Sequence, residues 1–239
     1  MKESTFWKLA LITLTLTACN SQNIVQTDTS HVNKKTIPSQ SKPRLDVDIV
    51  ILDPGIDRLD QDTTVTTPGI RRAESHYIAQ RLRDTLIESD RWGSVLVVPN
   101  SGREIDLTIS GKILESDGEV LKLEISTLDS RNKKWFTKIY KEKVTRFSYD
   151  PEIRREQIPF KKIYDRIEKD ILREINKAKF STLTEIKNIS EMRFASNFAK
   201  ERFNDSFKLE GKQLKLVRLP DESDPDLRRI REIRKREKT

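Results

Sequence analysis

Short stretches in which apolar and polar residues alternate predict the strands of a sheet. The first spans residues 45–52, where the alternation runs into a continuous apolar stretch. Val95–Val98 is a second short apolar run, and a turn signal follows it. Residues 105–140 alternate three times, with turns at Asp117-Gly118 and at 129–132, and therefore predict a three-stranded antiparallel meander.

Apolar residues at helical spacing predict two helices that would cover such a sheet. One is expected from about Ile70 to Ser89, and the other, with the most regular spacing in the chain, begins near Pro159. The residues expected to face the core are Ala73, Tyr77, Ile78, Leu82 and Leu86 in the first helix and Phe160, Ile163, Tyr164, Ile167, Ile171, Leu172 and Ile175 in the second. We expect the second helix to lie across the sheet.

Beyond residue 180 the patterns are shorter. A helical pattern covers 184–203, and 214–219 predicts a short strand. The last helix is expected to begin at Pro225, with Asp224 as its N-cap, and it carries a narrow apolar stripe among arginines. It either docks on its own domain or offers a basic face to a partner or a membrane surface. The candidate contact residues of that face are Arg228, Arg229, Arg231, Arg234, Lys235 and Arg236.

The order of these elements predicts an α+β fold. We expect an antiparallel or mixed sheet that contains the meander, helices packed on one of its faces, and a helical carboxyl-terminal extension. The α+β domain would span 45–180, and a mainly helical region with the basic terminal helix would span 181–239.

The first 44 residues differ from the rest. Residues 1–18 have a positive start and a short apolar run, the layout of a secretory signal peptide, and the run is too short and too interrupted to cross a membrane. Residues 19–44 are polar, rich in Ser, Thr, Asn and Gln, and are expected to form a flexible tether.

The stretch Leu16-Thr17-Ala18-Cys19 resembles the lipobox of bacterial lipoproteins. The resemblance implies cleavage before Cys19, a diacylglycerol on its sulfur and an acyl group on its new amino terminus. Because Asn20 is not Asp, the resemblance also implies delivery to the outer membrane of a Gram-negative bacterium, with the protein on the periplasmic face. Two or three acyl chains would hold the protein at the membrane almost permanently.

A second resemblance concerns the folded part. Asp106-Leu107-Thr108-Ile109-Ser110-Gly111-Lys112-Ile113, after a helix and the strand at 95–98, resembles a motif of a periplasmic α+β domain. That domain occurs at the amino terminus of TolB, in the curli-secretion lipoprotein CsgG and in lipoprotein activators of penicillin-binding proteins. The likeness covers about 45–178, and a shared architecture does not establish a shared function.

Composition restricts the function classes. The formal charge is +8, from 46 basic and 38 acidic residues, and it falls to 8 − 1 = +7 without residues 1–18, which carry Lys2, Lys8 and Glu3. The two signs are interspersed, so attraction to an anionic surface fits better than nucleic-acid binding, and no nucleic-acid partner is expected. A single cysteine excludes a disulfide within the chain and a zinc site of several thiolates.

No catalytic motif stands out. His31 lies in the tether and His76 on a helix, and neither belongs to a metal-binding pattern. None of the seven glycines forms a phosphate-binding loop, so no cofactor is expected. Asp53, Asp57, Asp60 and Asp62 lack the glycine and glutamate of a calcium loop and are interpreted as a solvated loop. Trp135, Phe136 and Tyr140 form either a carbohydrate-stacking patch or a group divided between two faces of a strand.

The sequence therefore predicts a non-enzymatic outer-membrane lipoprotein that acts as a docking or assembly factor for another envelope component. Its partners would be the membrane, through the lipid on Cys19, and an envelope protein. Two alternatives remain at this stage. One is an envelope hydrolase of peptidoglycan or glycan that uses carboxylates. The other is a module that binds an anionic glycan or lipid.

Overall fold

The computed structural model describes residues 42–58, 67–145, 149 and 158–237. Cys19, His31, Asp60 and Asp62 lie outside these residues, as do the proposed signal peptide and nearly all of the proposed tether. Residues 41–239 form one compact unit, so the boundary expected at residue 180 falls inside it. Among the described residues, no helix is long and apolar enough to cross a membrane.

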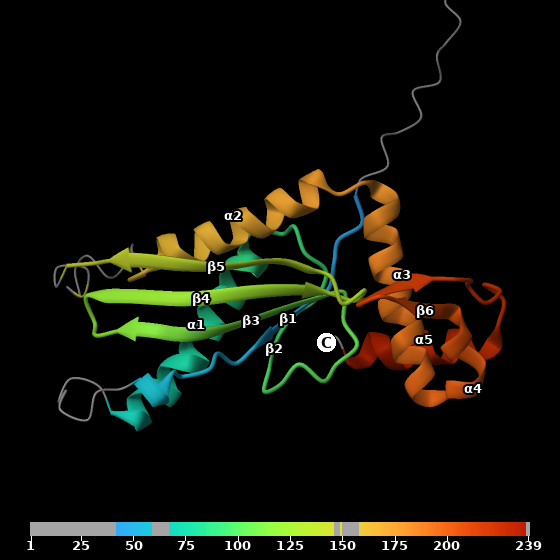
Figure 1. Ribbon diagram of the computed structural model, residues 1–239, viewed down its shortest axis with the longest axis horizontal. Helices are drawn as coiled ribbons and strands as arrows, with labels where there is room; N and C mark the ends of the chain where they lie inside the picture. The colour runs from blue at the N-terminus through green and yellow to red at the C-terminus, as the bar shows by residue number, and fades with distance from the viewer. Residues whose placement is uncertain (1–41, 59–66, 146–148, 150–157, 238–239) are drawn as a thin grey trace, which may run out of the picture. The chain divides into compact units, whose positions relative to one another are not determined.

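A mixed five-stranded sheet forms the centre of this unit, with strand order β2-β1-β3-β4-β5 (Figure 1). Its strands are β1 (Val47–Val50), β2 (Val95–Val98), β3 (Leu107–Ser116), β4 (Val120–Asp129) and β5 (Lys134–Lys143). β1 pairs in parallel with both β2 and β3, whereas β3, β4 and β5 form the predicted antiparallel meander. The α+β fold with a mixed sheet is confirmed.

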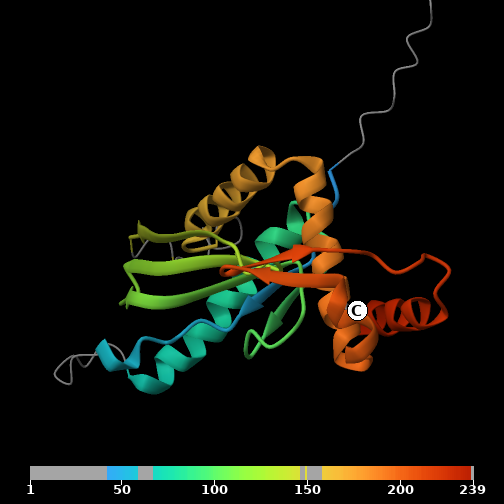
Figure 2. The ribbon, with the colours of Figure 1, turned by 45° about the vertical axis from the view of Figure 1, so that its right-hand side comes forward.

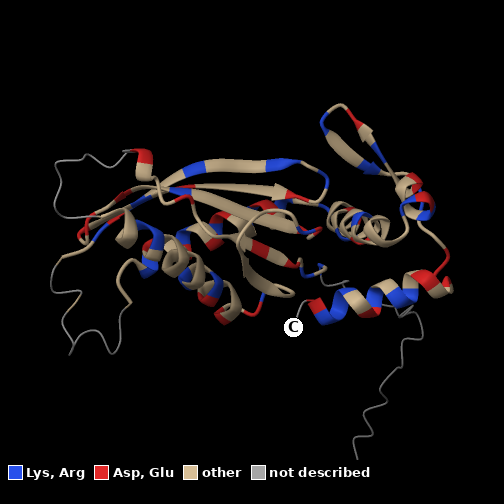
Figure 3. Ribbon diagram, turned by 90° about the horizontal axis from the view of Figure 1, so that it is seen from below, with Lys and Arg blue, Asp and Glu red and all other residues tan. Residues whose placement is uncertain are grey.

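Helices α1 (Pro68–Glu88) and α2 (Lys161–Lys177) pack on one face of the sheet, as the sequence predicted. Alternate residues of β4 are buried against the helices, while the intervening Lys122, Glu124 and Ser126 are less buried and belong to the opposite face of the strand. Figure 3 shows the two helices on one side of the sheet. The core between the layers contains Val47, Ile49, Leu82, Leu86, Leu107, Ile109, Leu123, Ile125, Ile163 and Ile167. Burial of these apolar side chains is the main stabilising term for the sandwich.

The predicted apolar stripe of α1 is partly wrong. Ile78, Leu82 and Leu86 are buried, but Ala73 is exposed and Tyr77 is 52% exposed, with its ring under the guanidinium of Arg81. The buried face of α1 instead includes polar residues and a small one, namely Arg71, Ser75, Ala79 and Thr85. Periodicity misassigned the face because its first turns carry polar residues inward. The N-cap is Thr67, whose hydroxyl accepts from the backbone N–H of Ile70 at 3.4 Å.

The aromatic residues of β5 belong to the core. Tyr140 is buried, and Trp135 and Phe136 are partly buried and packed against the core cluster. A register shift between β4 and β5 at Thr127/Leu128 allows the neighbouring residues Trp135 and Phe136 both to pack inward.

The remaining elements follow α2 after a two-residue link. They are α3 (Phe180–Phe198), the short α4 (Lys200–Phe203), the 3-10 turn η3 (Asn204–Ser206), β6 (Phe207–Glu210), β7 (Gln213–Leu216) and α5 (Pro225–Glu237). β6 and β7 form a separate two-stranded hairpin (Figure 2). The strand expected at 214–219 is thus shorter and shifted, and its partner β6 was not predicted.

Helix α5 packs on α3. Asp224 caps it as predicted, since its carboxylate accepts from the backbone N–H groups of Asp226 at 2.9 Å and Leu227 at 3.3 Å. Leu227 and Ile230 are buried in a second core cluster with Met192, Phe194, Ala195 and Phe203. α5 is therefore docked on its own compact unit.

Candidate functional site

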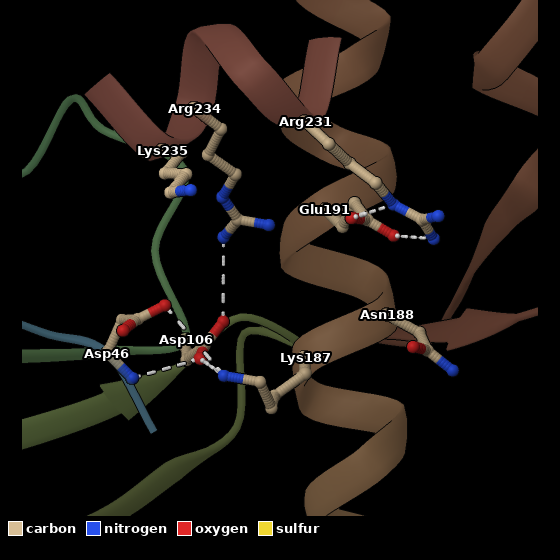
Figure 4. A pocket seen from close by; sticks show the side chains of 8 residues that line it. All are labelled: Asp46, Asp106, Lys187, Asn188, Glu191, Arg231, Arg234 and Lys235. Atoms are coloured by element: carbon tan, nitrogen blue, oxygen red, sulfur yellow. Dashed lines mark hydrogen bonds and ion pairs between the residues drawn. The ribbon is translucent and has the colours of Figure 1, made fainter. Parts of the chain in front are cut away.

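A buried carboxylate, Asp106, lies where the sheet meets α3 and α5. The residue immediately precedes β3 and is 1% exposed. Its carboxylate accepts hydrogen bonds from the backbone N–H of Asp46 and from the ammonium of Lys187, each at 3.0 Å, and from the hydroxyl of Ser190. A guanidinium nitrogen of Arg234 lies 3.5 Å from its other oxygen. Donors from Asp46, which immediately precedes β1, from α3 and from α5 thus converge on the carboxylate of Asp106 (Figure 4).

Asp46 supports this arrangement from the sheet side. Its carboxylate accepts from the backbone N–H of Ser94 at 2.8 Å, and Lys187 Nζ lies 3.8 Å from its other oxygen. The residue before Ser94 must be small, because a Cβ on Gly93 would lie 2.2 Å from an Asp46 carboxylate oxygen. This close approach fixes the start of β1 against the loop that leads into β2.

Arg234 and Arg231 reach into the same junction from α5. Arg234 is buried, and its guanidinium donates to the hydroxyl of Ser190 at 2.6 Å and to the backbone carbonyl of Glu104 at 3.3 Å. Arg231 forms a two-pronged pair with Glu191 at 2.7 and 3.0 Å. Hydrogen bonds from Arg231 to Glu191 and to Glu222 raise the pKa of its guanidinium. Paired guanidinium and carboxylate groups of this kind hold geometry well.

The junction encloses a pocket of about 310 Å³. It is lined by Asp46, Asp106, Lys187, Asn188, Glu191, Arg231, Arg234 and Lys235 (Figure 4). The hydroxyl of Ser190 donates to the carboxylate of Asp106, accepts from the guanidinium of Arg234 and lies 3.1 Å from the carbonyl of Lys187. The cluster joins α3 and α5 to the sheet. Removing one of its charged partners would leave an uncompensated buried charge, which strongly destabilises a folded protein. We call these residues the Asp106 latch, defined as Asp106, Lys187, Ser190 and Arg234.

The six predicted contact residues of the terminal helix divide into two groups. Arg231 and Arg234 point into the protein and form the contacts above, so Arg234 cannot belong to an outward face. Arg228, Arg229, Lys235 and Arg236 are exposed. Figure 3 shows the basic residues along α5, which ends at the marked carboxyl terminus. The hypothesis of a basic contact surface on α5 therefore now concerns these four exposed residues.

Other predicted site residues are used for structure. Lys112 lies 3.0 Å from a carboxylate oxygen of Asp53 and 4.0 Å from one of Asp57, which ties the start of the Asp-rich loop to β3. His76 is exposed on α1. In the described part of the chain, no group of three or more His, Cys, Asp or Glu side chains could hold a metal ion.

Sequence reasoning missed the Asp106 latch. Asp106 lies 81 positions before Lys187 and 84 before Ser190, and Arg234 follows Ser190 by another 44. The one local signal was an aspartate between Ile105 and Leu107 at the start of a core strand, because a charged residue flanked by buried ones must find partners.

Glu142 is a titratable group beside a second cavity. Burial raises the pKa of its carboxyl, and the guanidinium of Arg166, 3.9 Å away, offsets this only in part. One of its oxygens has no hydrogen-bond partner in the described residues. It borders a cavity of about 500 Å³ that is also lined by Phe160, Lys161 and Asp165. A carboxyl with a raised pKa in a cavity is the kind of group that serves as a general acid.

Comparisons with known proteins add little to this geometry. No protein-family model matches the chain. No curated protein matches it either. Among solved structures, the chain is similar to the hypothetical protein CT253 from Chlamydia trachomatis, with 11% identity and a TM-score of 0.32. That match covers 58% of this chain and 97% of the chlamydial one.

Proposed function

We propose that this protein is a non-enzymatic lipoprotein of the outer membrane that docks on another component of the cell envelope. The observation that carries the proposal is Leu16-Thr17-Ala18-Cys19, placed after an apolar run and before a polar stretch. Acylated Cys19 would anchor the chain on the periplasmic face of a Gram-negative outer membrane. The polar stretch would then separate the anchor from the compact unit that begins at residue 41.

The way the charged groups are used supports a docking role. The Asp106 latch and the Arg231–Glu191 pair hold the inner side of α5, which leaves its outer side rigid. That outer side carries Arg228, Arg229 and Arg236, and the exposed Lys235 lies at its edge, beside the Asp106 pocket. A rigid basic surface loses little freedom on binding, and it complements an acidic protein surface. We therefore assign the envelope protein partner to this side of α5.

Two experiments test the proposal in the native host. Mass spectrometry of the purified protein should find Cys19 acylated and residues 1–18 absent, and a Cys19→Ala variant should leave the membrane fraction. A photo-crosslinking amino acid in place of Arg229 should give a discrete adduct with an envelope protein.

A matched pair of variants controls the crosslinking experiment. Arg228→Glu with Lys235→Glu should remove the adduct, whereas Lys133→Glu with Lys134→Glu, at another exposed site, should retain it. An unacylated Cys19 would refute the anchor. Absence of any adduct from position 229, or an adduct that survives reversal of the α5 charges, would refute docking through α5.

Glu142 favours one alternative function, a carboxylate-dependent envelope hydrolase. Its raised pKa and the neighbouring Asp165 in the 500 Å³ cavity fit a general acid with a second carboxylate nearby. Purified protein incubated with cell-wall sacculi should release soluble fragments if this alternative is right, and Glu142→Gln should abolish the release. Intact sacculi after incubation with the wild-type protein would refute it.

A further inference from the structure

The first described residue, Lys42, is hydrogen-bonded to the carboxyl end of α2. Its ammonium donates to the backbone carbonyls of Ile175, Asn176 and Ala178 at 2.9, 2.8 and 2.9 Å. These carbonyls lie at the carboxyl end of α2, where the backbone N–H of Ala178 also donates to the carbonyl of Ile175 at 3.2 Å. The negative end of the helix dipole favours a cation there. The chain therefore enters the unit at the corner between α2 and α3 (Figure 1).

Exposed lysines lie at this entry point, at the end of α2 and on its link to α3, and at the start of β5. We call Lys42, Lys133, Lys134, Lys177 and Lys179 the lysine corner; all five are exposed. Lys177 pairs with Glu174 at 2.7 Å, and the other four have no carboxylate partner within 42–58, 67–145, 149 and 158–237. Three of the five carry no contact that fixes the ammonium to a described residue, so their charge is available to an external anionic group.

The corner also has a hollow and an exposed aromatic ring. A cavity of about 440 Å³ lies between the turn that precedes β5 and the link between α2 and α3, with Lys133, Trp135, Lys179 and Thr182 among its lining residues. Phe180, at the start of α3, is 41% exposed. Lysines beside a partly exposed aromatic ring are the combination found where proteins meet lipid headgroups.

The place of the lysine corner along the chain favours a membrane as the surface that it contacts. From Cys19 to Lys42 the chain advances 42 − 19 = 23 residues, which reach at most about 80 Å when fully extended and about 25–29 Å as a flexible chain. An anchor at Cys19 therefore keeps the corner, of all parts of the unit, covalently nearest to the bilayer. The basic side of α5 is attached farther along α3, near Ser190, about 15 Å from its first turn.

We propose that the lysine corner is the membrane-facing surface of this protein and that it docks on anionic phospholipid headgroups. The proposal rests on the lipid anchor of the proposed function and gives the compact unit an orientation. The corner contacts the lipid surface, and the basic side of α5 is left for the protein partner. Each lysine near an anionic surface favours contact about fivefold, so Lys133, Lys134 and Lys179 together favour it about 100-fold.

The single cysteine of the chain permits a direct test. Since Cys19 would be blocked by acylation, a cysteine introduced by Ser181→Cys at the corner, or by Ser223→Cys just before α5, takes a fluorescent label specifically. The acylated full chain is reconstituted into vesicles of phosphatidylcholine alone or with about one third phosphatidylglycerol, both with an acceptor dye on the headgroups. Energy transfer from position 181 should rise with phosphatidylglycerol and fall back in 1 M salt, where the screening length is about 3 Å. Transfer from position 223 should not rise.

Charge-reversal variants decide which surface is responsible. Lys133→Glu, Lys134→Glu and Lys179→Glu in one chain should lower the ratio of docked to undocked protein at least about 100-fold. The matched control, Arg228→Glu, Arg229→Glu and Lys235→Glu, should leave it unchanged. All residues replaced are exposed, and circular dichroism confirms that each variant is folded.

The outcomes separate this proposal from the one on which it rests. If energy transfer from position 181 of the acylated chain is the same with both kinds of vesicle, the proposal that the lysine corner docks on anionic lipid is refuted. The proposal of a lipid anchor at Cys19 is then unaffected. Loss of docking in the α5 variant alone also refutes docking through the lysine corner. A bare Cys19 in the mass spectrum, before any labelling, instead refutes the anchor.

Discussion

The Asp106 latch gives the strongest prediction about stability. Asp106→Ala removes the acceptor for the backbone N–H of Asp46, for Lys187 and for Ser190, and it leaves Arg234 without its carboxylate. Arg234 is 7% exposed, so its charge stays buried after the substitution. Lys187 then keeps its hydrogen bond to the carbonyl of Arg44, at 2.8 Å, and the more distant carboxylate of Asp46, at 3.8 Å.

The magnitude follows from the charge that is left uncompensated. Removing one partner of a buried ion pair costs about 3–5 kcal/mol. For a unit of this size each kcal/mol shifts Tm by about 2–4 °C, so Tm should fall by about 6–20 °C. Because the latch joins α5 to the sheet, amide hydrogen exchange in α5 should accelerate more than in β4.

The assay is urea and thermal unfolding of the full chain, followed by circular dichroism and tryptophan fluorescence. Asp205→Ala is the matched control, because Asp205 is 76% exposed and its pair with Arg218 at 3.9 Å is a surface contact, so the change should stay within about 0.5 kcal/mol. A loss below about 1 kcal/mol for Asp106→Ala would refute the reasoning, as would equal acceleration of exchange in α5 and β4.

Three further predictions concern single positions. Gly55→Ala should destabilise the protein more than Gly118→Ala: both glycines have positive φ, but a Cβ at 55 would lie 2.2 Å from the carbonyl oxygen of Ile113, and a Cβ at 118 meets nothing within 4 Å. Gly118→Ala should cost about 1 kcal/mol in urea unfolding, and an equal cost at both positions would contradict the geometry. Asp224→Ala removes the N-cap of α5 and should cost about 1 kcal/mol in the same assay; no change would show that the cap contributes nothing. Burial alone would raise the pKa of Asp170, but hydrogen bonds from Lys138 and Tyr140 lower it below its usual value. The stability Asp170 contributes is therefore present above its unfolded pKa and lost as pH falls through the lower folded value, so Asp170→Asn should flatten the acid limb of Tm against pH below about 5, and an unchanged limb would refute the assignment.

The sequence predicted most of the sheet and α2 because burial follows a strict period there. In β4 every second residue from Leu121 to Thr127 is buried. In α2 the predicted residues Ile163, Tyr164, Ile167 and Ile171 are buried. Such segments face a core on one side along their whole length, so the hydrophobic pattern records the structure directly.

The misses occur where burial does not follow the pattern. α1 buries Arg71 and Ser75 while Tyr77 is half exposed, so in its first turns the apolar residues do not mark the inner face. β6 was not predicted because its residues are exposed or only partly buried, and a strand without a buried face shows no alternation.

The functional site was harder to predict than the fold. The Asp106 latch is built from one aspartate, one lysine, one serine and one arginine, which are ordinary residues in a highly charged chain. Only the chain topology brings them together, so spacing could not single them out. The terminal helix was correctly located, yet which of its arginines turn inward depends on Ser190 and Glu191, forty residues or more earlier.

The short distance along the chain from Lys42 to β1 has a mechanical consequence. β1 begins five residues after Lys42 (47 − 42) and runs between two parallel neighbours, β2 and β3. Hydrogen bonds between strands lie across the strand direction. Tension applied through residue 42 along β1 therefore loads these bonds together in shear and does not peel them one by one. If the proposed lipid anchor holds Cys19 and a bound partner pulls on the compact unit, the force acts along β1. The inter-strand hydrogen bonds of the sheet resist force best in that direction.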